Sequence, residues 1–370
     1  MVDRANRNST IKDVAMLAGC GIASASRVLN RSGYVSPQLR EKVLAAAQQL
    51  GFDFSDIGRS FRNQATKTIG CVVPSISNPV YSVAVQGIQD VVVGKGRHLL
   101  LSCSNYDPER EFLAVRNLIA KRVEALVLTV NDPKASAALD LVRSRQVPHC
   151  LLFNHDPGSP NACGVDNRAA AYEVVRAFAN AGHRHFVYVA LRLSSSDRAS
   201  QRLEGLEAAC NDLGLDMPAV LEIEDRPNRL KEDLETFLRA NPEATGIFAS
   251  NDQLAIAIIA ALRELGLKVP ADLSIVGFDG IEFGQMLEPT LATVVTDPYA
   301  MGRAAADMVL SMGHLADAHL DSRVAGFSFR SGGSLGPAAT GKPLVEKLPL
   351  PHQHISPRKN VKLTSEERRK

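Results

Sequence analysis

Hydrogen-bonding side chains follow one apolar run after another between residues 69 and 279. These runs alternate with amphipathic stretches, which is typical of parallel β-sheets covered by helices on both faces. Ligands of such sheets bind beyond the carboxyl ends of the strands. The side chains expected there are mostly neutral amides: Ser75, Asn78, Tyr81, Asn105, Asn131, Asn154, Arg192, Asn251 and Asp279. This set favours a polyhydroxylated or carboxylated small molecule over an apolar one.

Three arginines gather beside the end of one expected strand. Arg192, Arg198 and Arg202 surround Ser196, which precedes a helix whose amino terminus favours an anion. These residues therefore favour an acidic ligand, and a neutral sugar or a purine is the alternative.

Motifs for catalysis, cofactors and metals are missing from the sequence. It contains no GxSxG, GxGxxG, P-loop or HExxH pattern. His183 and His185 point to one side of an extended strand, but no third metal ligand is evident, so we expect a structural or solvated role. The six cysteines form no CxxC pair, and we expect most of them to be small buried residues. Neither an enzyme nor a cofactor is predicted.

Charge is unevenly distributed along the chain. The 370 residues carry a net charge of only +2, but residues 1–67 hold ten Lys and Arg against five Asp and Glu. Such a local excess suits phosphate binding. The amino terminus lacks an apolar signal region and no run approaches a membrane span. These features predict a cytoplasmic protein of two or three domains.

The amino-terminal segment reads as three short helices. Thr10 and Asp13 form a capping-box variant before a helix that ends at Gly19, and Gly21 begins a second helix. Ser36 caps a third helix with Pro37 at its first position. Two helices around a glycine turn also occur in ordinary helical bundles, so this pattern alone is weak.

The complete string is more specific. TIKDVAMLAG, ASASRVLN and VSPQLREKVLAAAQQLGF closely resemble the head of the lac repressor (LacI/GalR) family of bacterial transcription factors. The resemblance runs from Thr10 to about Ser334. It implies an all-α helix-turn-helix head followed by an α/β, periplasmic-binding-protein-like effector domain, whose two lobes contain parallel sheets and enclose a cleft. It also implies a DNA-binding transcriptional regulator, acting as a repressor under control of a small molecule.

Four segments follow from this resemblance. Residues 1–52 form the DNA-binding head, 53–68 the hinge, 69–335 the two-lobed effector and dimerisation domain, and 336–370 a disordered tail rich in proline and charge. In the family the hinge becomes helical on DNA and inserts an apolar side chain into the minor groove, at the position of Phe61. Gly58 costs roughly 1 kcal/mol inside a helix, so we expect this hinge to be more disordered off DNA than is usual.

The predicted DNA contacts lie mainly on the second helix. Ile22, Ala23 and Arg27 are expected at base edges in the major groove, whereas Thr10, Ser24 and Ser26 position phosphates. The predicted DNA-binding set is Thr10, Ile22, Ala23, Ser24, Ser26, Arg27, Asn30, Arg59 and Phe61.

The resemblance also implies an effector site. Arg202 and Asp279 match positions that contact ligand, although a structural ion pair is the alternative. For the asparagines of the predicted effector set, which follow below, helix capping is the alternative role. The predicted effector set is Asn78, Tyr81, Asn154, Arg198, Arg202, Asn251 and Asp279. Similarity to gluconate repressors in stretches such as GLKVPADLSIVGFDG favours a sugar acid, such as gluconate or a phosphorylated relative.

The expected partners are a palindromic double-stranded operator, a small-molecule effector and a second copy of the chain. Residues 79–94 and the region after Asp279 are predicted to supply dimer surface. The tail lacks the run of leucine heptads that would join two dimers into a tetramer, so we expect a dimer. Whether effector releases or promotes DNA binding stays open. The alternative is a solute- or carbohydrate-binding protein of the same two-lobed fold, but it predicts a secretory signal and no basic head.

Overall fold

The computed structural model describes residues 9–29, 33–52, 66–155, 160–223, 229–313, 320–340 and 344–348. The head contains α1 (Ile11–Leu17), α2 (Ile22–Leu29) and α3 (Pro37–Gln49). Thr10 and Asp13 form the predicted capping box, and Gly19 takes the left-handed conformation, φ 66°, that turns the chain between α1 and α2. Small side chains, among them Val14, Ala25 and Val43, fill the core of the head.

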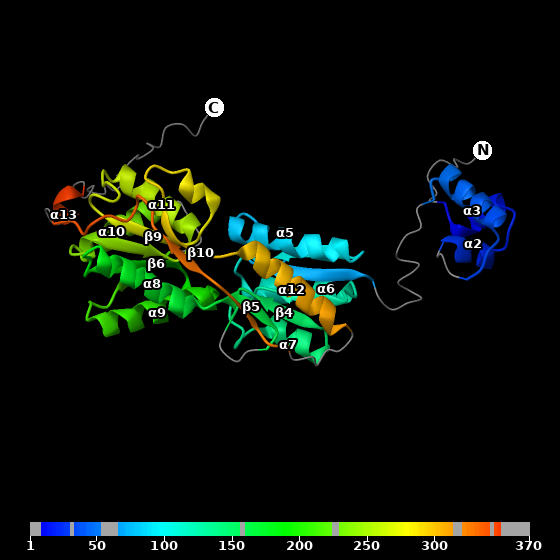
Figure 1. The fold of residues 1–370 in the computed structure, drawn as a ribbon, viewed down its shortest axis with the longest axis horizontal. Coiled ribbons are helices and arrows are strands. Elements are labelled where there is room, and N and C mark those ends of the chain that lie inside the picture. Colours follow the sequence, from blue (N-terminus) through cyan, green and yellow to red (C-terminus); the bar gives the residue numbers. More distant parts are fainter. Residues whose placement is uncertain are drawn as a thin grey trace, which may run out of the picture.

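The amino lobe is a six-stranded sheet in the order β11-β5-β4-β3-β1-β2. Its elements are β1 (Thr68–Val73), α5 (Pro79–Gly94), β2 (His98–Cys103), α6 (Pro108–Ala120), β3 (Ala125–Leu128), α7 (Ala137–Ser144), β4 (His149–Leu152), β5 (Ala162–Val165), α12 (Pro298–Met312) and β11 (Arg323–Ala325). All paired strands of this sheet run parallel. Helices α5 and α12 cover one face, and α6 and α7 cover the other (Figure 1).

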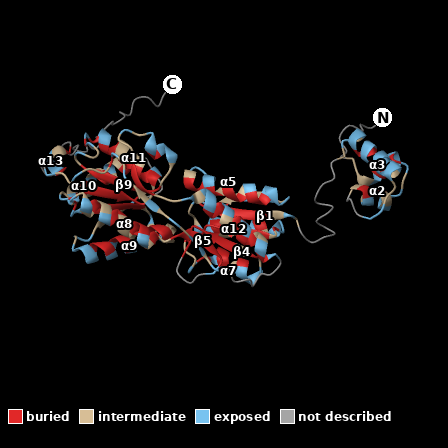
Figure 2. Cartoon of the chain, viewed as in Figure 1, coloured by how far each residue is buried: buried red, intermediate tan, exposed pale blue. Residues whose placement is uncertain are grey.

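The carboxyl lobe repeats the plan with the order β12-β10-β9-β8-β6-β7. Its elements are α8 (Asn167–Asn180), β6 (Phe186–Leu191), η1 (Leu193–Ser195), α9 (Asp197–Leu213), β7 (Ala219–Ile223), α10 (Leu230–Ala240), β8 (Gly246–Ala249), α11 (Asp252–Glu264), β9 (Ser274–Asp279), η3 (Glu282–Gln285), β10 (Ala292–Val295), β12 (Ser328–Arg330) and α13 (Leu344–Lys347). β12 pairs antiparallel with β10, and the other strand pairs described in this sheet run parallel. Buried residues concentrate in the strands and the inner helix faces of both lobes (Figure 2).

The described chain passes between the lobes three times, after β5, after β10 and after β11. Consequently α12 returns from the carboxyl lobe and packs tightly on α5. A Cβ atom added at Gly302 would collide with the carbonyl oxygen of Ala84, and one at Gly87 would collide with that of Tyr299. Glycine at both positions therefore permits the close approach of the two helices.

The tail prediction is wrong for residues 336–340 and 344–348. Gly336 donates its N–H to Ser274 Oγ at 3.1 Å, Leu344 and Leu348 are buried against the carboxyl lobe, and Lys347 pairs with Asp272 at 2.7 Å. Leu344 and Leu348 lie four residues apart, so they share one face of a helical turn and pack together on the lobe although the residues around them are polar. The remaining tail positions lie outside the described residues. Among the described helices, none has the length and apolar character needed to span a membrane.

Candidate ligand cleft and DNA-binding helix

The exposed face of α2 carries the predicted base-reading side chains. Ile22, Ala23 and Arg27 are exposed, whereas Ala25 and Val28 of the same helix are buried in the head. Ser24 and Ser26 are half-buried beside this face. Thr10 Oγ1 accepts the N–H of Asp13 at 3.4 Å and donates to Asp13 Oδ2 at 2.6 Å, so its hydroxyl already caps α1. Asn30, Arg59 and Phe61 lie outside the described residues.

A cleft of about 440 Å³ lies where the two lobes meet. It contains six of the seven predicted effector residues: Asn78, Tyr81, Arg198, Arg202, Asn251 and Asp279. Asn78 caps α5 and Tyr81 lies in it, both in the amino lobe, and the other four belong to the carboxyl lobe. Residues that were predicted to follow strand ends, such as Asn78 of the amino lobe and Asp279 of the carboxyl lobe, therefore line the same cavity.

Three contacts hold Arg202 in the cleft. Its guanidinium lies 3.4 Å above the ring of Phe278, Nε donates to Asn167 Oδ1 at 2.9 Å, and Nη1 donates to the carbonyl of Ser250. Burial lowers the pKa of Arg202, but an arginine remains charged throughout the physiological range. Arg202 forms no ion pair with any carboxylate in the part of the chain that the structure describes.

Asp279 ends β9 with a positive φ of 118° and is 8% exposed. Burial raises the pKa of its carboxyl to about 8. The positive charge of Arg202 opposes this increase, and the negative charge of Asp252 adds to it. Asp252 in turn accepts the N–H groups of Gly280 and Ile281, both at 2.8 Å, which fixes the turn after β9. The raised pKa favours the protonated carboxyl, which can donate a hydrogen bond into the cleft.

Asn78 and Asn251 both line the cleft and cap helices. Asn78 Oδ1 accepts the N–H of Val80 at 3.2 Å, and Asn251 Oδ1 accepts that of Leu254 at 2.8 Å. Capping occupies these oxygens and holds the side chains at the cleft wall. Their ligand role remains a prediction.

Aromatic side chains form the wall of the amino lobe. Tyr81 meets Phe153 edge to face at 5.3 Å and Tyr106 at 6.4 Å between ring centroids. Burial raises the pKa of Tyr106 well above its usual value. Sequence reasoning missed Tyr106 and Phe153, although each directly adjoins a predicted strand-end amide, Asn105 and Asn154 respectively. An aromatic wall beside polar groups is suited to the apolar face of a sugar ring.

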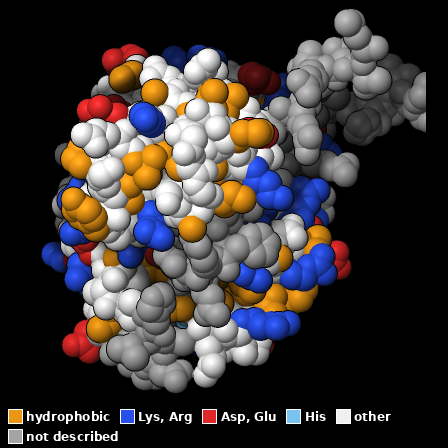
Figure 3. Space-filling model, turned by 90° about the vertical axis from the view of Figure 1, so that its right-hand side faces the viewer, with side chains coloured by type: hydrophobic (Ala, Val, Ile, Leu, Met, Phe, Trp, Pro, Cys, Tyr) orange, Lys and Arg blue, Asp and Glu red, His pale blue; other side chains and the backbone are white. Residues whose placement is uncertain are grey.

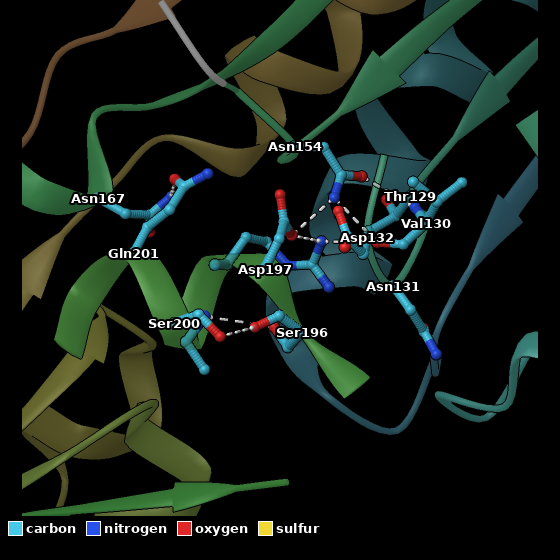
Figure 4. Close-up of polar contacts among 12 residues, drawn as sticks. Thr129, Val130, Asn131, Asp132, Asn154, Asn167, Ser196, Asp197, Ser200 and Gln201 are labelled. Atoms are coloured by element: carbon cyan, nitrogen blue, oxygen red, sulfur yellow. Dashed lines mark hydrogen bonds and ion pairs between the residues drawn. The ribbon is translucent and has the colours of Figure 1, made fainter. Parts of the chain in front are cut away.

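Asn154 lies outside this cleft and ties the two lobes together instead. Its Nδ2 donates to Asp197 Oδ1 at 2.8 Å and to the carbonyl of Val130 at 2.9 Å, while its Oδ1 accepts the N–H of Val130 (Figure 4). Asn154 faces a second hollow, of about 860 Å³, on the other side of this contact. Its side chain therefore has a structural role.

Arg198 completes the contact between the lobes. It is 5% exposed, pairs with Asp197 Oδ1 at 2.8 Å, and donates from the same Nη1 to Val130 O at 2.9 Å. Burial raises the pKa of Asp197, although the charge of Arg198 opposes this shift. Among the residues that the structure describes, none accepts a hydrogen bond from Nη2 of Arg198. This arginine lines the cleft and also joins the lobes.

Two further predictions concern residues away from the cleft. His183 is buried, with Nδ1 2.8 Å from Thr245 Oγ1 and Nε2 3.0 Å from Gly336 O, and burial lowers its pKa. His185 pairs with Asp216 at 2.6 Å. These contacts confirm the expected structural role of His183. The six cysteines are free, and four of them are buried.

Known proteins resemble the chain over most of its length. Residues 10–53 match the family described as bacterial regulatory proteins, lacI family, and residues 175–325 match a periplasmic binding protein-like domain. The HTH-type transcriptional regulator GntR of Escherichia coli strain K12 is 30% identical over 309 residues, which cover 82% of this chain and 92% of GntR. Catabolite control protein A of Priestia megaterium is 28% identical over 301 residues, covering 80% and 90% of the two chains.

A solved structure shares both the head and the lobes. The lac repressor dimer bound to operator and the anti-inducer ONPF aligns with a TM-score of 0.77 and 25% identity, covering 89% of this chain and 99% of that one. Together with the exposed face of α2 and the two-lobed cleft, these similarities show that the chain is a DNA-binding transcriptional regulator belonging to the lacI family.

Proposed function

We propose that this regulator is a homodimeric repressor whose operator affinity is set by a sugar acid, such as gluconate or a phosphorylated relative, bound between the lobes. The observation that carries the proposal is the charge balance of the cleft. Asp197 pairs with Arg198 at 2.8 Å, whereas Arg202 forms no ion pair within the described residues and burial favours the protonated carboxyl of Asp279. The cleft is therefore cationic before it binds ligand, which favours an anion.

The remaining lining supports a hydroxylated anion. Asn78, Asn251 and Ser196 offer hydrogen-bonding groups, while Tyr81 and Phe153 offer a flat apolar surface. The 30% identity to GntR and the operator-bound lac repressor dimer support the same class of function. Ligand that contacts both lobes would change their relative position and so alter DNA binding by the head, which is a coupling free energy between two sites.

The test is a thermal-shift screen with four separate probes: gluconate, 6-phosphogluconate, a neutral hexose and a purine base. A ligand that binds only the folded state raises its melting temperature. We expect the two acids to raise the midpoint of the wild-type protein and to leave that of Arg202→Ala unchanged. A response to the hexose or the purine alone would contradict the proposed ligand class.

A second measurement tests regulation. Operator duplex selected from a random pool is titrated with the full-length protein, with and without the acid that scores in the screen. We expect the affinity to change in the wild-type protein and not in Arg202→Ala, whose unliganded operator affinity should equal that of wild type. The direction of the change gives the sign of the coupling.

A further inference from the structure

Basic residues follow the ends of three of the four described helices of the amino lobe, whereas the fourth, α12, ends at Gly313. Helices α5, α6 and α7 end at the cap residues Lys95, Lys121 and Arg145. In a parallel sheet the end of each helix and the start of the next strand meet at the same edge. These positions therefore share one face of the lobe. Figure 3 views the molecule from the end that carries the head, and Lys and Arg side chains are spread over the face that it shows.

Cations at helix ends favourably oppose the helix dipole, which is the ordinary explanation for them. The carboxyl lobe provides an internal comparison because it has the same topology. Its helices α8, α9, α10 and α11 end at uncharged cap residues: Ala181, Gly214, Asn241 and Leu265. Two of these helices carry a basic residue in the last turn instead, Arg239 of α10 and Arg263 of α11, but α8 and α9 carry none there. This topology therefore does not require a basic residue at every helix end.

The connections between helix end and strand start show the same contrast. In the amino lobe, residues 95–97, 121–124 and 145–148 contain five Lys and Arg and one Glu. In the carboxyl lobe, the four corresponding connections, 181–185, 214–218, 241–245 and 265–273, contain two Lys and Arg and three Asp and Glu. One lobe therefore presents a cationic edge and its structural twin does not.

Most of these cations are available for an external partner. Arg97 is paired with Glu124 at 2.6 Å. Lys95, Lys121, Arg122 and Arg145 are exposed, and none forms an ion pair with another residue of the described ranges. Together with the exposed Lys67, these four residues are called the basic edge below.

The basic edge is also where the chain arrives from the DNA-binding head. Thr66 donates its hydroxyl to the carbonyl of Arg122 at 2.6 Å, and Lys67 O accepts the N–H of His98 at 2.8 Å. Thirteen residues, 53–65, separate the last described residue of the head from Thr66. They span at most about 45 Å when extended and about 20 Å as a helix. DNA bound by the head is therefore within reach of this edge.

We propose that the basic edge binds phosphates of the DNA that flanks the operator, so that the amino lobe extends the footprint of the head. This inference rests on DNA binding by the head and not on the identity of the effector. Exposed charges act over a Debye length of only about 8 Å at physiological salt, so the interaction requires close approach of the lobe to the duplex. Flanking sequence should not matter, because phosphate contacts carry no base information.

The test compares two duplexes with full-length protein. One ends at the boundaries of the selected operator, and the other adds a dozen base pairs of unrelated sequence on each side. Binding is followed by fluorescence anisotropy over a salt series. We expect wild type to bind the long duplex roughly tenfold more tightly at low salt, with a salt slope steeper by about 0.9 for each additional phosphate contact.

The triple variant Lys95→Gln, Lys121→Gln, Arg145→Gln removes three of the five cations of the basic edge and should lose most of the preference for the long duplex, while its affinity for the short duplex stays that of wild type. The matched control, Arg184→Gln, Arg263→Gln, Lys268→Gln, removes three exposed cations from the corresponding edge of the carboxyl lobe and should behave as wild type. Equal wild-type affinity for both duplexes, or a triple variant that keeps its preference for the long one, would overturn the inference and point to an acidic protein as the partner of this edge. Equal loss on both duplexes would also overturn it, because it indicates damage to the head or the hinge.

Discussion

Asn154 donates a hydrogen bond to Asp197 at 2.8 Å, and the two residues belong to different lobes. The neighbouring Arg198 bonds both Asp197 and the carbonyl of Val130, so one small network closes the contact between the lobes. Because Arg198 also lines the ligand cleft, a bound ligand competes for or reinforces the same guanidinium. The network therefore provides a physical route from the cleft to the relative position of the lobes.

Asn154→Ala should weaken communication without removing the ligand site. The substitution deletes the side-chain bonds to Asp197 and Val130, which lie outside the cleft. We expect ligand affinity to stay within a few-fold of wild type. The fold-change in operator affinity that the ligand causes should become smaller by roughly 5-fold or more. Anisotropy titrations measure both quantities. Asn117→Ala, an exposed asparagine on α6, is the control, and an unchanged ratio in Asn154→Ala would rule out the network as the route.

Asp279 should give the protein an unusual dependence of stability on pH. Its folded pKa of about 8 lies above its ordinary value of 3.8, so the folded state holds this proton more tightly than the unfolded chain does. The resulting stability is complete below the ordinary pKa and is lost as pH rises through 8, with a slope of at most about 1.4 kcal/mol per pH unit. Relative to Asp279→Asn, wild type should therefore lose melting temperature steadily from pH 5 to pH 8. Parallel melting curves for the two proteins would show that Asp279 ionises normally.

His183 acts in the opposite direction. Burial lowers its pKa below 6.5, so the folded state favours the neutral ring, and stability is lost as pH falls below that value. We expect a His183→Gln variant to be less stable than wild type at pH 7 but to show a smaller further loss between pH 7 and pH 5. Thermal melts at the two pH values measure this difference. An equal loss in both proteins would assign the acid sensitivity to other groups.

Arg27→Ala should remove sequence discrimination while keeping weak binding to any duplex. Arg27 is exposed on α2, and one well-placed arginine contact with a base contributes about 1–3 kcal/mol of discrimination. Binding through phosphates persists and stays strongly salt-dependent. Arg40→Ala, which removes an exposed arginine from α3, should retain specificity. Footprints of Arg27→Ala that match wild type would exclude a base-reading role for this side chain.

Leu344→Ala should destabilise the carboxyl lobe although it lies in the polar tail. The side chain is 5% exposed against α10 and its neighbours, and loss of a buried leucine typically costs about 2–5 kcal/mol. Val345→Ala changes the adjacent, exposed position and should have little effect. Melting temperatures of the two variants make the comparison, and equal values would show that α13 contributes no packing energy.

Much of this architecture could be predicted from the sequence because local patterns determine it. Apolar runs and capping residues located most strands and helices. Strand ends located the following cleft residues: Asn78, Tyr81, Asn105, Arg192, Asn251 and Asp279. The position of Asn154 could not be predicted in the same way. Helix α9 turns Arg198 and Arg202 toward the cleft but Asp197 and Ser200 toward the second hollow, and only packing of the two lobes decides which side a given loop meets.

The segments that return to the other lobe escaped prediction for a related reason. Helix α12 has a clear start at Asp297 and Pro298, but no local feature of its sequence says that it packs on α5. The tail was predicted to be disordered because it contains many prolines and charges. The spacing of Leu344 and Leu348 indicates instead a turn of helix that packs on the lobe.

The threefold passage of the chain between the lobes has a consequence for biosynthesis. The amino lobe begins at Thr68, but it receives α12 and β11 only when residues 298–325 have been translated, after almost all of the carboxyl lobe. On the ribosome the head can fold first, whereas the face of α5 that α12 covers stays open until the end. The nascent regulator therefore acquires its DNA-reading helix long before it acquires a complete cleft with which to control it.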